Sequence, residues 1–262
     1  MNDPYVAVGD IHVLPSSQAA PGHGVLPVNA FLLRDRAPVL VDTGQAADRD
    51  SFLHRLWSLV DPDDLRWVFL THEDRDHAGN LLAVLEAADR SRLVTNYVTV
   101  GKLLEAFSVP LDRVVVVNPG QTFSTTQRQL GVIRPPLFDA SGTVGLTDPA
   151  TGAVFTVDAF GTYLPELVES IDDVPSVEAA AGLADFNRAN HPWAELVDQG
   201  RFERALDGLR RVEPTLLLSS HGVLAPGRTD ELLRSLAALP SMGPYVPPDQ
   251  ERFEALRPEM GG

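Results

Sequence analysis

The sequence of 262 residues contains no cysteine and only one lysine, Lys102. Without cysteine the chain can form no disulfide, no iron–sulfur cluster and no thiolate metal site, so histidine and the carboxylates are the strong metal ligands that it offers. The absence of cysteine favours neither an oxidising nor a reducing compartment. Arginine carries nearly all the positive charge, which we interpret as a compositional bias of the genome and not as a functional feature.

Long apolar runs are missing as well. No run approaches the roughly 20 residues that a helix needs to span a bilayer. The N-terminal sequence MNDPYVAVGDIHVL also lacks the basic start and the apolar stretch of a signal peptide. We therefore expect a cytoplasmic protein without a membrane partner.

Positive charge is too scarce for a general polyanion-binding protein. The formal net charge is −15, and such a field repels a phosphate backbone. We therefore expect no nucleic-acid partner, although a local basic patch could override the net field.

Apolar residues make up 44% of the chain, which is enough for a substantial core. The sequence shows no internal repeat, low-complexity tract or interdomain linker. We expect one domain over residues 1–262, in which the proline-rich residues 240–262 form a C-terminal tail. Such a tail could cover a pocket, reach a neighbouring subunit or be frayed.

Strand-like and helix-like segments alternate along the sequence. Short apolar runs bounded by turn residues predict strands at residues 29–33, 38–41, 67–70, 93–97, 113–117, 131–134, 154–157 and 215–219. Apolar residues at helical spacing predict helices at residues 48–60, 81–88 and 228–238, and a mostly helical stretch over residues 164–211. This alternation predicts an α/β fold, and helices covering two sheets would make an αββα sandwich.

Polar residues that can bind metals are concentrated directly after the strand expected at residues 67–70. They are His72, Asp74, Asp76 and His77. Two ions a few ångströms apart could share this loop, one taking His72 and Asp74 and the other Asp76 and His77. Alternatively, the segment is an acidic surface turn in which Asp76 caps the helix that starts near Ala78.

Three more candidate ligands follow other expected strands. Asp158 ends an apolar strand, where a carboxylate can bridge two metals, while His221 and Asp139 follow two further strands. Each residue alone is explained by a turn or by a loop hydrogen bond. Because all three fall at the C-terminal ends of strands, together they favour a metal site.

Three other residues are weaker candidates. Asp42 could support the metal-binding loop, although turn formation explains it nearly as well. His23 could stand at the mouth of the site and hydrogen-bond a small molecule, or be an ordinary loop histidine. For His191 we expect a packing role.

The order of the motifs resembles the metallo-β-lactamase superfamily over essentially the whole chain. The motifs are VDTG at residues 41–44, TH-x-D-x-DH-x-G at 71–79, VDAFG at 157–161 and SHG at 220–222. The central motif of that superfamily usually reads H-x-H-x-D-H. A carboxylate at the position of Asp74 is similar to the flavodiiron proteins, which carry H-x-E-x-D-H.

The resemblance implies a specific set of ligands. One metal would take His72, Asp74, Asp139 and Asp158, and the other would take Asp76, His77, His221 and the shared Asp158. Two positions depart from the family pattern: Asp74 is one methylene shorter than the usual glutamate, and Asp139 stands where the family normally has histidine. The resemblance also implies a homodimer.

The family's C-terminal flavodoxin module has no counterpart in these residues. We therefore expect no intrinsic FMN and an external electron donor. Four aspartates neutralise two divalent ions, and oxygen-rich coordination suits iron or manganese better than zinc.

The first functional hypothesis is a di-iron protein that binds or reduces O2 or NO, and an oxygen sensor is one form of this hypothesis. A small apolar pocket, to which Phe138, Phe160 or Tyr163 could contribute, would suffice for such a ligand. One alternative is a hydrolase in which a metal-bridging hydroxide attacks an ester, thioester or lactone. Another is a protein that holds metals without turnover.

Overall fold

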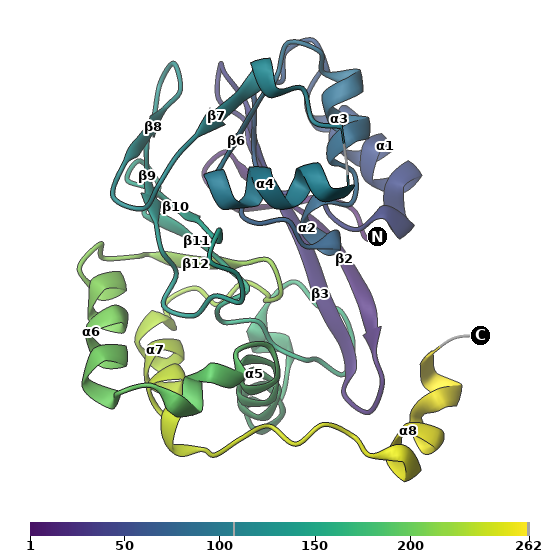
Figure 1. Ribbon diagram of the computed structural model, residues 1–262, viewed down its shortest axis with the longest axis vertical. Coiled ribbons are helices and arrows are strands. Elements are labelled where there is room, and N and C mark those ends of the chain that lie inside the picture. Colours follow the sequence, from purple (N-terminus) through teal and green to yellow (C-terminus); the bar gives the residue numbers. More distant parts are fainter. Residues whose placement is uncertain (107, 261–262) are drawn as a thin grey trace.

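Two β-sheets pack face to face, and helices cover their outer surfaces (Figure 1). The computed structural model describes residues 1–106 and 108–260. The first sheet has seven strands, which lie side by side in chain order: β1 (Tyr5–Val8), β2 (Ile11–Ala20), β3 (Gly24–Leu33), β4 (Val39–Val41), β5 (Trp67–Phe69), β6 (Arg92–Thr95) and β7 (Val114–Val116). Strands β1 to β4 pair antiparallel, and β4 to β7 pair parallel.

The second sheet has five strands in the order β12-β11-β10-β9-β8. They are β8 (Thr122–Ser124), β9 (Gln129–Ile133), β10 (Gly145–Asp148), β11 (Ala153–Val157) and β12 (Leu216–Ser219). Only β11 and β12 pair parallel. Each sheet therefore contains a parallel part whose strands end at the same edge.

Apolar side chains from both sheets form the central core. Phe31 of β3 and Phe155 of β11 meet edge to face, with ring centroids 5.3 Å apart. A second cluster lies between the first sheet and helices α1 (Arg49–Leu59) and α3 (Leu81–Ala87). A third lies between the second sheet and α6 (Gln199–Arg210) and α7 (Thr229–Ala237), next to α5 (Ser176–Asn190). The predicted αββα sandwich is thereby confirmed.

Three segments differ from the expected elements. The expected strand at residues 93–97 ends at Thr95, because the Asn96 side chain accepts a hydrogen bond from the Val98 amide (3.0 Å) at the start of α4 (Tyr97–Ala106). Strand β2 was not among the expected strands, and it contains Pro15. Pro15 lies beyond the β2 residues that pair with β1, at a sheet edge where a missing N–H costs little. Residues 164–175 precede α5 and are not α-helical.

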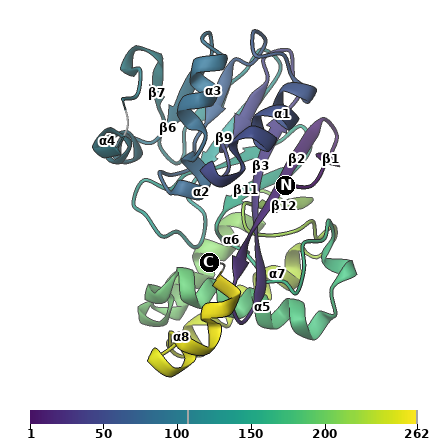
Figure 2. The same ribbon diagram turned by 90° about the vertical axis from the view of Figure 1, so that its right-hand side faces the viewer.

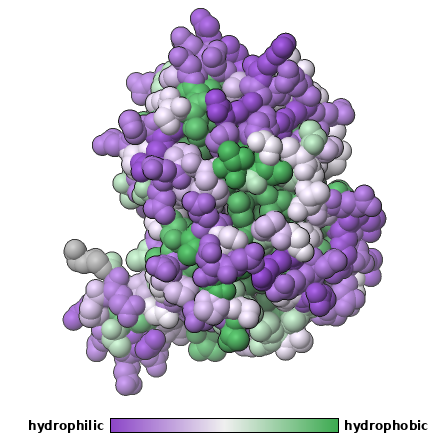
Figure 3. Space-filling model, turned by 180° about the vertical axis from the view of Figure 1, so that it is seen from behind, coloured by the Kyte–Doolittle hydropathy of each residue, from purple (hydrophilic) through white to green (hydrophobic). Residues whose placement is uncertain are grey.

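The C-terminal tail packs against the tip of the long β2–β3 hairpin (Figure 2). Within it, α8 (Gln250–Leu256) buries Leu256, and Glu259 accepts a hydrogen bond from the Gly22 amide (2.8 Å). Seen from behind, α8 projects from the body of the molecule (Figure 3). Residues of the tail also line a pocket together with the hairpin tip, which agrees with the expectation that the tail could cover a pocket. Among the described helices, none is both long and apolar enough to cross a membrane.

Candidate metal centre

The carboxyl ends of strands from both sheets meet at the candidate site. Asp42 follows β4, His72 follows β5, Asp158 follows β11 and His221 follows β12. Asp42 and Val157 both adopt a left-handed backbone conformation with φ near 60°. This conformation is strained for residues other than glycine. It turns the backbone sharply at the ends of β4 and β11. Such strained turns are typical of functional sites.

The structure brings all seven predicted metal ligands together. Three of them face each other around His72, whose Nε2 lies 3.7 Å from an oxygen of Asp74, of Asp139 and of Asp158. Asp139, which stands where the family normally has histidine, lies beside His72. His72, Asp74 and Asp139 thus form one three-residue group that could hold a cation.

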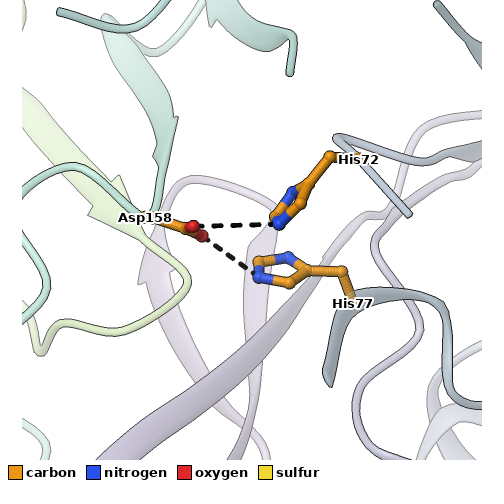
Figure 4. Close-up of side chains that lie close together, drawn as sticks. All are labelled: His72, His77 and Asp158. Carbon is orange, nitrogen blue, oxygen red and sulfur yellow. Dashed lines mark ion pairs between the residues drawn. The ribbon is translucent and has the colours of Figure 1, made fainter. Parts of the chain in front are cut away.

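The second group consists of Asp76, His77 and His221. An oxygen of Asp76 lies 3.9 Å from His77 Nε2, and the other lies 3.5 Å from His221 Nε2. Asp158 faces one histidine of each group, His72 and His77 (Figure 4). Its Oδ2 faces His72, and its Oδ1 lies 3.1 Å from His77 Nε2 and 3.5 Å from His221 Nε2. This arrangement fits the implied division into two ions that share Asp158.

Hydrogen bonds hold each histidine with Nε2 towards the centre. The Nδ1 atom of His77 lies 2.8 Å from Asp42 Oδ2, and that of His221 lies 2.8 Å from the Pro27 carbonyl oxygen. His72 Nδ1 lies 3.2 Å from the Thr71 hydroxyl. Because these oxygens can accept, each Nδ1 can carry the proton and leave the Nε2 lone pair for a metal.

Two ligand atoms in the centre are buried without a hydrogen-bond partner among the described residues. They are His72 Nε2 and Asp158 Oδ1. His77 Nε2 and His221 Nε2 also approach each other to 3.3 Å. When both rings carry their proton on Nδ1, two nitrogen lone pairs face each other at this distance. Buried polar atoms are almost always partnered, so a cation between these atoms would satisfy the whole set. The residues therefore fit a metal centre.

The electrostatics of the cluster favour positive charge at its centre. Burial by itself lowers the pKa of His77, but the Asp42 and Asp158 carboxylates outweigh it and hold that pKa well above its usual value. Burial raises the pKa of Asp158, yet His72 and His77 together bring it well below the usual range. A metal ion would replace the protons that these histidines otherwise bind.

Access to the cluster differs from side to side. The Asp74 side chain is 54% exposed, whereas that of Asp158 is 4% exposed and that of His72 is fully buried. A small ligand can therefore approach from the Asp74 side. Asp74 also occupies the N-terminal position of the short helix α2 (Arg75–Ala78), with Asp76 inside the helix. The alternative expectation that Asp76 caps this helix is therefore wrong.

Asp42 occupies the position expected of a supporting residue. Its Oδ1 accepts hydrogen bonds from the amide and the hydroxyl of Thr71, each at 2.9 Å. Its Oδ2 accepts from His77 Nδ1. The carboxylate is fully buried, so it fixes the orientation of His77 from behind.

Sequence reasoning missed Asn190, which lies at the end of α5. Its side-chain amide donates to Asp158 Oδ2 at 3.1 Å and lies 3.5 Å from His191 Nε2. His191 is buried, its Nδ1 lies 3.2 Å from the Asn187 carbonyl oxygen, and burial lowers its pKa to about 4. A neutral His191 in the interior agrees with the expected packing role. A series of contacts from Asn187 through His191 to Asn190 therefore positions Asp158.

His23 lies in a different pocket from the cluster. Its ring stacks on Tyr163 with centroids 4.5 Å apart. It makes no hydrogen bond or ion pair with any of the seven cluster residues in the described part of the chain.

A metal-binding role for the cluster predicts the effect of Asp42→Asn. Loss of the anionic partner makes the His77 imidazole a weaker metal ligand. The affinity for ferrous iron should therefore fall by about 10- to 100-fold. Anaerobic competition with a chelator measures this. Asp148→Asn is the matched control, since Asp148 is also buried but pairs with Arg128. Equal losses in both variants would show that Asp42 acts only through stability.

The comparisons with known proteins agree with this geometry. A family model described as the metallo-β-lactamase superfamily matches residues 23–212. A diflavin flavoprotein homologue from Thermosynechococcus vestitus is 28% identical over 207 residues, which cover 79% of this chain and 35% of that protein. A nitric oxide reductase from Moorella thermoacetica is 24% identical over 214 residues, which cover 78% of this chain and 51% of that protein.

Solved structures show the same fold. Rubredoxin oxygen:oxidoreductase from Desulfovibrio gigas matches with a TM-score of 0.77 at 18% identity, over 91% of this chain and 61% of that chain. Other similar structures are flavodiiron proteins. This chain spans about a third of the length of the diflavin flavoprotein homologue and about half of the length of the nitric oxide reductase. Diflavin flavoproteins are similar to this chain in sequence, and flavodiiron proteins are similar to it in fold. By its family match the chain belongs to the metallo-β-lactamase superfamily.

Proposed function

We propose that this chain holds two metal ions, iron in the first place, and that it binds or reduces O2 or NO. The observation that carries the proposal is the convergence of seven histidine and aspartate side chains around buried ligand atoms that lack partners. One ion is assigned to His72, Asp74 and Asp139, the other to Asp76, His77 and His221, and Asp158 to both.

The composition of the cluster supports iron over zinc. Four carboxylates against three imidazoles make an oxygen-rich and formally neutral set for two divalent ions, which suits iron or manganese. When bound, a pair of iron ions would supply one-electron redox chemistry and open coordination positions for a diatomic ligand. The names of two similar proteins, a nitric oxide reductase and an oxygen:oxidoreductase, favour the same chemistry.

The protein's own residues have three tasks in this proposal. Asp42, Thr71 and the Pro27 carbonyl orient the histidines, which limits rearrangement when the metal charge changes. Asn190 fixes the shared Asp158. The more exposed Asp74 side admits the small ligand, while the buried Asp158 side excludes water.

Electrons would arrive from a separate donor protein, which stays a prediction. A homodimer and a cytoplasmic location stay predictions. The sensor and enzyme forms of the proposal differ in turnover: a sensor binds O2 or NO once per centre, whereas a reductase consumes it continuously.

The test is to load the protein anaerobically with iron, supply dithionite and follow O2 and NO with electrodes. We expect consumption above that of dithionite alone, absent from the zinc-loaded protein and from Asp158→Ala. Binding without continued consumption would favour the sensor. A protein that takes up zinc only and hydrolyses a β-lactam, lactone or thioester, with the activity lost in His77→Ala, would contradict the proposal and support a hydrolase.

A further inference from the structure

A second pocket lies away from the metal cluster, where the β2–β3 hairpin meets the C-terminal tail. Its volume is about 340 Å³, and its walls include Gln18, His23, Tyr163, Tyr245, Arg252 and Leu256. Volumes of this order are typical of sites for small molecules. None of the seven cluster residues lines it, so it is distinct from the metal centre.

Aromatic rings form one wall of this pocket. His23 and Tyr163 stack with an interplanar angle of 19°, and Tyr245 lines the same space. Tyr163 is held from behind by Phe186, whose ring meets it edge to face at 5.5 Å. A planar ligand that extends this stack would gain contact area without requiring the rings to reorganise.

Arg252 of α8 provides a positive charge at the rim. One nitrogen of its guanidinium reaches within 3.4 Å of where a Cβ atom on Gly22 would lie, so it points to the hairpin tip. No carboxylate in the described part of the chain lies within ion-pair distance of it. The nearby Glu259 carboxylate accepts a hydrogen bond from the Gly22 amide instead. The guanidinium is therefore available for an anionic group.

We propose that this pocket binds a planar aromatic anion, whose rings extend the His23–Tyr163 stack and whose anionic group lies at Arg252. The aromatic wall and the guanidinium select for that class together, since either alone would accept a wider range of ligands. The proposal does not depend on the metal centre being loaded.

The pocket is nevertheless connected to the cluster through ring contacts. Phe186 lies 5.5 Å from Tyr163 on one side and 5.3 Å from the His221 ring on the other. A ligand on Tyr163 is therefore two aromatic contacts from a candidate metal ligand.

Calorimetric titration of the full chain with naphthalene-2-sulfonate tests the proposal, and its uncharged sulfonamide serves as the matched probe. We expect saturable binding of one sulfonate per chain, with the sulfonamide bound about tenfold more weakly because it lacks the charge. Arg252→Gln should weaken sulfonate binding by about tenfold, and Arg257→Gln, which removes the same charge from the same segment outside the pocket, should not.

Ring stacking is tested separately at His23. His23→Leu should weaken binding of both probes, and His23→Phe should restore it because the ring is retained. The proposal is overturned by an absence of saturation, by equal binding of sulfonate and sulfonamide, or by equal effects of Arg252→Gln and Arg257→Gln. Titrations of metal-free and iron-loaded protein keep this test separate from that of the metal centre.

Discussion

Replacing Asp158 by alanine should empty both metal positions. Asp158 is the one carboxylate whose two oxygens face both groups, with Oδ2 towards His72 and Oδ1 towards His77 and His221. Its loss would remove a ligand from each ion and leave the two ions without a shared anion to offset their mutual repulsion. Elemental analysis of protein purified without added metal should show close to two ions per chain in the wild type and near none in Asp158→Ala.

The matched variant is His221→Ala, which removes a ligand from one group only. We expect it to lose mainly the ion assigned to Asp76 and His77. Thermal unfolding of both metal-free variants separates loss of ligands from loss of structure. Retention of both ions in Asp158→Ala, or equal losses in the two variants, would mean that Asp158 does not bridge.

The second large effect is expected at Gly182, in the middle of α5. A Cβ atom there would lie 2.0 Å from the backbone oxygen of Tyr163, a distance that no rotamer change can relieve. Helix α5 would have to move away from the segment that leads from Asp158 to Tyr163. We therefore expect Gly182→Ala to lower the free energy of unfolding by about 3 kcal/mol, measured by urea denaturation.

Gly101 in α4 is the control for this prediction. A Cβ atom there would meet nothing within 4 Å, so Gly101→Ala should raise the free energy of unfolding by about 0.5–1 kcal/mol through its better helix propensity. Because α5 also carries Asn190, Gly182→Ala should weaken metal binding as well. Equal stabilities of the two variants would show that α5 can shift without cost.

The sequence by itself determined the fold class and identified the candidate residues of the site. The short apolar runs and helical periodicities predicted most strands and helices. They do so because a helix or a strand that buries one face places its apolar residues at the spacing of that element. The lack of cysteine restricted the ligands to histidine and carboxylate. The position of each candidate directly after a strand, together with the order of motifs, indicated which residues to group.

Only the tertiary structure decided how those residues meet. Asp139, Asp158 and His221 are far from His72 in the sequence, so their distances depend on how the two sheets pack and not on any local pattern. The same holds for Asn190, which reaches Asp158 from the C-terminal end of α5. Strand β2 was not among the expected strands, and it pairs with β3 over its whole length. The sequence left several outcomes open for the C-terminal tail, and only contacts with residues distant in the chain decide between them.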